Sequence, residues 1–181
     1  PNRPAAASSP ARTDNLRHVR AGQYEAGVDA DGRLASLRVR GVEFLAAPAG
    51  LPRGSYFAEE EGKGALKLTE VDQPAPDVVT ARCDRASARY EFSPDAVTWT
   101  ATNETDGPLA LFLLLDGSAL TAAGDGRGEY QRPPLLQEEW DTSVWYAGGA
   151  RLKIRGGARV WGEPGRSWQT WYAPLAPHET R

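Results

Sequence analysis

Hydrophobic and polar residues alternate along much of this chain, in short runs separated by turn-forming residues. Between positions 97 and 102, Val97, Trp99 and Ala101 alternate with three threonines. A period of two is typical of an antiparallel strand with one face toward the core and the other toward water. No window of a dozen residues keeps the spacing of an amphipathic helix, so the pattern predicts strands throughout.

One run does not alternate. Residues 109–115, with the sequence LALFLLL, are apolar at every position. A strand of this kind is covered on both faces. We expect the core of the protein to cover one face. We expect the other face to be covered by the long segment 117–137 or by a protein partner outside this chain.

Turn signals punctuate the alternating runs, because glycine (19 residues) and proline (14 residues) are spread along the whole chain. Asp31-Gly32 and Ser93-Pro94-Asp95 mark two hairpin turns, and Gly41 interrupts a strand as a bulge would. The runs number roughly 10–12, with short connections between them. The sequence therefore predicts an all-β fold, an antiparallel two-sheet β-sandwich with little helix.

The length of 181 residues suits one domain with one core. Residues 1–20 form the predicted flexible N-terminal segment, and residues 21–181 the predicted single β-sandwich domain. The first fifteen residues are rich in Pro, Ala, Ser and Arg and lack a periodic apolar pattern. Such a stretch often follows a removed export signal, so we expect a periplasmic or extracellular location. A plain flexible tail is the alternative.

Charge and motif content exclude several classes of function. The net charge of −3, from 24 acidic and 21 basic residues, argues against a nucleic-acid partner. No apolar run approaches the ~20 residues of a membrane span. The single cysteine, Cys83, rules out an intrachain disulfide. Because no HExxH motif, paired cysteines or EF-hand loop is present, we expect no metal and no cofactor.

Aromatic residues are the strongest candidate signal for a binding site, since tryptophan and tyrosine crowd the C-terminal half. A flat ring can cover the apolar face of a sugar, while charged side chains bond its hydroxyl groups. Many of these rings must belong to the core, and those that flank the long segment 117–137 are the best exposed candidates. The predicted ligand-binding residues are Trp140, Trp145, Tyr146, Glu139, Asp141, Arg151, Arg127 and Tyr130.

Three stretches resemble a known family. GVDADGRLASLRVRGVEFL, ARYEFSPDAVTWTATNETDGPLALFLLLD and SWQTWYAPLAPHETR are similar to the strands and turns of galactose-mutarotase-like sandwich domains of bacterial carbohydrate-active proteins. The resemblance spans most of residues 23–181 and implies a sandwich in a carbohydrate-related setting. Mutarotases use histidines with a carboxylate in the sandwich cleft. Because His18 and His178 lie near the chain ends, the resemblance implies no mutarotase activity here.

Three functional hypotheses follow from these observations. The first is an exported, non-catalytic domain that binds a poly- or oligosaccharide. The second is a glycoside hydrolase or lyase that uses two carboxylates, ~5–10 Å apart, from Glu139, Asp141 and Glu129. The third is an assembly domain, in which the apolar run 109–115 contacts a protein partner or a second copy of the chain.

Overall fold

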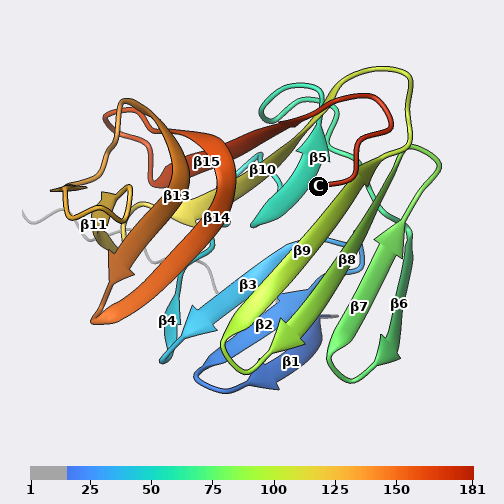
Figure 1. Cartoon of the computed structure of the whole chain (residues 1–181), viewed down its shortest axis with the longest axis horizontal. Coiled ribbons are helices and arrows are strands. Elements are labelled where there is room, and N and C mark those ends of the chain that lie inside the picture. Colours follow the sequence, from blue (N-terminus) through green and yellow to red (C-terminus); the bar gives the residue numbers. More distant parts are fainter. Residues whose placement is uncertain (1–15) are drawn as a thin grey trace, which may run out of the picture.

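The computed structural model describes residues 16–181, which form fifteen strands and no helix (Figure 1). One four-stranded sheet has the order β1 (Arg17–Ala21), β2 (Tyr24–Val28), β3 (Leu34–Val39), β4 (Val42–Glu43). A second has the order β6 (Glu70–Ala75), β7 (Val78–Arg82), β8 (Ala86–Ser93), β9 (Ala96–Asn103). The seven-stranded sheet has the order β12 (Tyr130–Gln131), β11 (Leu120–Gly124), β13 (Gln137–Ala147), β14 (Ala150–Trp161), β15 (Trp168–Leu175), β10 (Leu109–Asp116), β5 (Ser55–Ala58).

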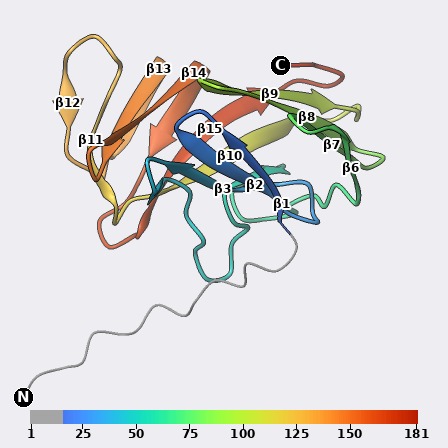
Figure 2. The same ribbon diagram turned by 90° about the horizontal axis from the view of Figure 1, so that it is seen from below.

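All strand pairs are antiparallel, and the predicted all-β, sandwich-like fold is confirmed. The strands outnumber the predicted 10–12 partly because β4 and β12 are only two residues long and leave no readable alternation. The strands also divide into three sheets rather than two. Seen from below, β6–β9 lie on one side of the molecule and β11–β13 on the other, with β1–β3 between them (Figure 2).

One main core joins the three sheets. It contains residues such as Leu37 from the first sheet, Tyr90 from the second and Trp171 from the seven-stranded sheet. Val19 of β1 is also buried in it, so β1, which falls within the predicted flexible segment 1–20, is part of the folded domain. The sequence of β1, RHVRA, holds one strongly apolar residue among charged ones and gives little strand signal. Residues 1–15, on which the export expectation rests, lie outside the described residues.

Strand β10 is buried on both faces, as predicted for residues 109–115. Its odd-numbered leucines enter the main core. Ala110, Phe112 and Leu114 enter a separate cluster, here called the second core, whose buried members also include Ala46, Tyr56 and Ala58. Partly buried Leu51, Ala65, Trp161, Trp168 and Tyr172 pack against it.

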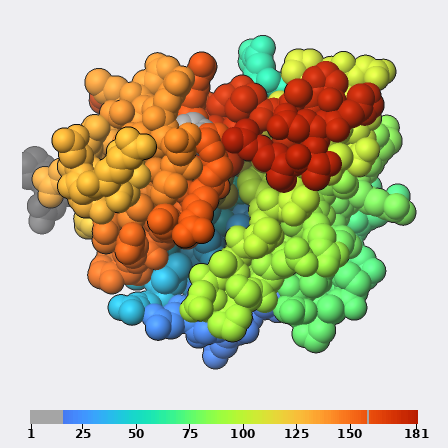
Figure 3. Space-filling view, viewed as in Figure 1, coloured from blue at the N-terminus to red at the C-terminus, as the bar shows by residue number. Residues whose placement is uncertain are grey.

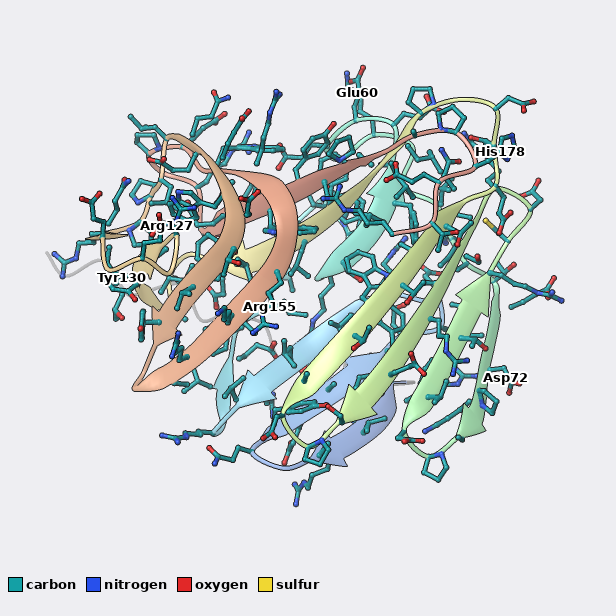
Figure 4. The ribbon with its side chains drawn as sticks, viewed as in Figure 1. Glu60, Asp72, Arg127, Tyr130, Arg155 and His178 are labelled. Atoms are coloured by element: carbon teal, nitrogen blue, oxygen red, sulfur yellow. The ribbon has the colours of Figure 1, made fainter. Side chains whose placement is uncertain are left out.

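The prediction of what covers this second face of β10 was wrong. Neither segment 117–137 nor a partner covers it, since the loops before and after β5 and the aromatic side chains of β14 and β15 do so. Glu61, in the turn after β5, accepts hydrogen bonds from Trp161 Nε1 at 3.0 Å and Thr170 Oγ1 at 2.7 Å. Figure 4 shows the neighbouring Glu60 at the outer end of this turn. Within residues 16–181, the run 109–115 therefore presents no exposed apolar face to a partner.

The tight turn predicted at Gly32 is present, whereas the bulge predicted at Gly41 is not. Gly32 has a φ of +74°, as a tight turn at Asp31-Gly32 requires, and Asp29 Oδ1 accepts hydrogen bonds from two backbone amides of that turn. Gly41 is not a bulge. Arg40 and Gly41 both have positive φ and form a two-residue turn between β3 and β4, where Val39 pairs with Val42.

Candidate functional site

A groove of about 900 Å³ lies on the face of β13 and β14 that points away from the main core. Residues 139–142 of β13 and Lys153, Gly157 and Arg159 of β14 line it, and Tyr172 and Pro174 of β15 form one wall. Residues 125–127, which follow β11, form the opposite wall. In the space-filling view the segment after β11 and the β13–β14 hairpin lie against each other (Figure 3).

The shape of the β13–β14 hairpin follows from its glycines. Gly148 and Gly149, both with positive φ, form the tight turn. The pairing runs evenly as far as Thr142 opposite Arg155 and then shifts, so that Asp141 lies opposite the two residues Gly156 and Gly157. Gly156 has a φ of +108°, which residues with side chains rarely adopt. Such a bulge bends and twists a strand pair, and Figure 1 shows the hairpin curling.

The bulge changes which side chains reach the groove. Asp141 and Thr142, adjacent in sequence, both line it, although regular alternation would direct them to opposite faces. Trp140 also lines the groove and packs partly against the main core, with its ring 6.3 Å from that of Trp145. One β-bulge therefore brings a carboxylate and a hydroxyl group to the surface that Trp140 also lines.

A second set of groove residues forms a row across three strands. Glu139 pairs in register with Arg159, and Arg159 with Tyr172. Arg159 Nε donates a hydrogen bond to Glu139 Oε1 at 2.8 Å. The Tyr172 ring contacts the rings of Phe112 at 5.3 Å and Trp161 at 5.5 Å. The second core therefore supports the wall that Tyr172 forms.

The charges in the groove are balanced. Asp125 lies 3.8 Å from Arg127, and Glu139 is paired with Arg159. Asp141 and Lys153 have no ion-pair partner within 4.0 Å among the residues that the structure describes. Both side chains are therefore available to bond a ligand.

Four of the eight predicted residues meet in this groove, namely Arg127, Glu139, Trp140 and Asp141. Three others form a separate group at the edge of the same sheet. The rings of Tyr130 and Tyr146 meet edge to face with 5.3 Å between centroids, and the neighbouring Tyr146 hydroxyl raises the pKa of Tyr130. Arg151 pairs in register with Tyr146. Figure 4 shows Tyr130 and Arg127 on the same part of the molecule.

The prediction that Trp145 is exposed was wrong. Its side chain is fully buried in the main core, and its Nε1 donates a hydrogen bond to Ser143 Oγ at 2.9 Å. Beyond the bulge, Ser143, Trp145 and Ala147 alternate toward the interior. Trp145 therefore cannot stack on a ligand in this structure.

Lys153, Arg159 and Tyr172 are among the groove residues that were not predicted from the sequence. Lys153 lies on the polar face of a clearly alternating strand, so its exposure was readable but its neighbours were not. Tyr172 was one of many aromatic residues near the C-terminus, and no sequence signal distinguished it. Arg159 could be found only from the register across the bulge.

Two further observations concern metal ions and membranes. In residues 16–181 no group of three or more His, Cys, Asp or Glu side chains is placed to hold a metal ion. In the same part of the chain no helix has the length and apolar character needed to cross a membrane.

Comparison with known proteins gives a likeness in fold alone. No known family model matches the sequence, and no curated protein sequence matches it. The crystal structure of the Slr1438 protein from Synechocystis sp. PCC 6803 is similar, with a TM-score of 0.54 and 10% identity. The match covers 100% of this chain and 94% of that chain. The resemblance to galactose-mutarotase-like domains stays a prediction.

Proposed function

We propose that this protein is an exported, non-catalytic β-sandwich that binds a poly- or oligosaccharide in the groove on β13 and β14. The observation that carries the proposal is the composition of the groove. It combines two aromatic rings, Trp140 and Tyr172, with the unpaired side chains of Asp141 and Lys153. The resemblance of the sequence to domains of carbohydrate-active proteins points to the same class of ligand.

The groove offers a sugar both kinds of contact that it needs. The rings of Trp140 and Tyr172 are half-buried and held by packing, so their exposed parts can cover C–H groups of a sugar at little entropic cost. Asp141 can accept hydrogen bonds from hydroxyl groups, and Lys153 and Arg127 can donate to hydroxyl oxygens. Hydrogen bonds to charged groups are stronger than those between neutral groups.

Binding is favoured over catalysis by the surroundings of Glu139. Glycoside hydrolysis needs one carboxylic acid that keeps its proton, usually in an apolar site. Glu139 is instead exposed and accepts a hydrogen bond from Arg159. If the protein were a hydrolase, incubation with a bound polysaccharide would release new reducing ends, and Glu139→Gln would abolish their release. We expect no release from either protein.

The binding proposal is tested by titrating the protein with a panel of soluble polysaccharides in a calorimeter. We expect saturable binding to at least one of them. Asp141→Asn, which keeps the shape of the side chain, should weaken that binding about five- to tenfold through loss of a charged acceptor. Asp72→Asn is the matched control, because Asp72 is exposed on the separate β6–β9 sheet (Figure 4).

Two results would contradict the proposal. One is a flat response of the wild-type protein to the whole panel. The other is a loss of affinity in Asp72→Asn but not in Asp141→Asn. Asp72 lines a second concave surface on β6–β9, of about 750 Å³, so the latter result would move the site there.

A further inference from the structure

Beside the groove, β14 carries a row of basic side chains on one face. Arg151, Lys153 and Arg155 are exposed, while Leu152 and Ile154 between them pack against the main core. Alternate residues of a strand lie about 7 Å apart, so the three cations are spread over roughly 13 Å in a line. Lys153 also lines the groove, which makes the row and the groove one continuous surface.

These three cations have no acidic partner. Among residues 16–181, no carboxylate lies within 4.0 Å of any of them, and their side chains make no hydrogen bond to the protein. The basic residues around β8 differ, because Arg82, Arg85 and Arg89 are paired with Glu70, Glu59 and Glu91. The unpaired row is notable in a chain whose net charge is −3.

Aromatic side chains continue the surface at the outer end of the row. Arg151 is the register partner of Tyr146, and the Tyr146 ring contacts that of Tyr130, which is 44% exposed. Figure 4 shows Tyr130 and Arg127 to one side of β14 and Arg155 on β14 itself. A ligand that follows the row would meet exposed rings at one end and the groove at the other.

We propose that the saccharide bound by this protein is an anionic polymer whose acidic groups contact Arg151, Lys153 and Arg155. This inference rests on the proposed function of the groove. The groove suits hydroxyl groups, whereas Arg151 and Arg155 outside it, together with Lys153 in its lining, supply three positive charges that have no acidic partner within 4.0 Å among residues 16–181. A line of cations matches a linear chain with repeated acidic groups better than a single small anion. Carboxylate and sulfate groups both fit this chemistry.

The test compares polymers that share a backbone and differ in charge. Polygalacturonate is paired with its methyl ester, and dextran sulfate with dextran. We expect one charged polymer to bind about tenfold or more tightly than its neutral partner, with affinity falling as salt increases because exposed charges are screened. Which pair shows the difference distinguishes a carboxylate from a sulfate.

The double variant Arg151→Gln and Arg155→Gln, which leaves the groove residue Lys153 in place, should lose about fivefold or more in affinity for the charged polymer and keep its affinity for a neutral one. The double variant Arg82→Gln and Arg89→Gln changes the net charge equally and serves as the control, which should bind as the wild type does. Circular dichroism and thermal unfolding would check that both variants are folded.

Three other outcomes of these experiments would each overturn the anionic ligand, and one of them would also overturn the proposed function. Equal binding of charged and neutral polymers, unchanged in the Arg151→Gln and Arg155→Gln double variant, overturns the anionic ligand and leaves the proposed function standing. Binding of polyglutamate as tight as that of the charged polysaccharide would show a general polyanion surface, which also overturns the inference. If no polysaccharide binds at all, the inference and the proposed function both fail.

Discussion

At the scale of single residues, the buried side chain of Asn103 links the β9–β10 connection to the segment that follows β15. The residue is fully buried, and its Nδ2 donates to the carbonyl groups of Gly107 at 2.8 Å and Ala176 at 3.0 Å. Its Oδ1 accepts hydrogen bonds from the backbone amide and the hydroxyl of Thr105. Although residues 103–105 read N-E-T, this amide is occupied by the fold and is not presented as a glycosylation site would be.

Replacing Asn103 by alanine should therefore be costly. The variant leaves buried donors and acceptors without partners, and we expect the free energy of unfolding to fall by about 2–4 kcal/mol. Urea denaturation followed by circular dichroism measures the change. The exposed neighbour Glu104→Ala should cost less than about 0.5 kcal/mol. Equal stability of the two variants would contradict the role assigned to Asn103.

Single residues also show where sequence reasoning was weakest. Trp140 and Trp145 have the same side chain and lie five residues apart, yet one lines the groove and the other is in the core. Both were candidates because they flank the long segment 117–137, and tryptophan is common in cores as well as in binding sites. Alternation separates the faces of two residues that lie five apart, but it does not say which face is the core, and the bulge between them interrupts the pattern.

At the scale of elements, β10 connects the fold to the site. Its even-numbered residues build the second core, and Phe112 of that core contacts the Tyr172 ring that forms a wall of the groove. The apolar run predicted that both faces would be covered. The sequence could not identify the cover, because the turn that holds Glu61 lies about fifty residues earlier in the chain and is rich in charged residues.

Substitutions on the two faces of β10 test this arrangement. Leu111→Ala removes side-chain atoms from the main core and Leu114→Ala from the second core, so each should lower the free energy of unfolding by about 2–5 kcal/mol. Chemical denaturation gives both values. Thr98→Ala, on the exposed face of β9, is the control and should change stability little. A Leu114→Ala variant as stable as this control would show that the second core contributes nothing.

The β13–β14 hairpin shows why pairing was harder to predict than strands. The two-residue turn at Gly148 and Gly149 is readable, and simple counting from it places Glu139 opposite Ala158. The extra residue at the bulge moves the partner of Glu139 to Arg159. Strands follow from alternation, whereas register across a bulge depends on tertiary packing.

At the scale of the whole molecule, buried tyrosines couple stability to alkaline pH. Burial raises the pKa of Tyr24 to about 12, and the Tyr24 hydroxyl donates to the carbonyl groups of Ser93 and Ala96 in the turn of another sheet. Burial likewise raises the pKa of Tyr56 to about 12. An unfolded tyrosine has a pKa of about 10.

Above pH of about 10 the unfolded chain loses these protons first, so each group lowers the free energy of unfolding by up to ~1.4 kcal/mol per pH unit until it ionises in the folded state. The stabilisation is complete below pH of about 10 and is lost as the pH approaches 12. We expect Tyr24→Phe to show a shallower fall in denaturation experiments over this range. Lysines titrate there too, and the difference from wild type removes their contribution. Parallel pH curves for the two proteins would refute the coupling.

We propose that the curled β13–β14 hairpin and the segment 125–127 hold the saccharide, and the other binding predictions depend on this proposal. Hydrogen exchange followed by mass spectrometry, with and without a saturating polysaccharide from the panel, tests it most directly, because bound ligand slows local opening. We expect slower exchange in peptides that contain residues 125–127 and 139–142, and unchanged exchange in β6–β9. Protection confined to β6–β9, or no protection anywhere, would contradict it.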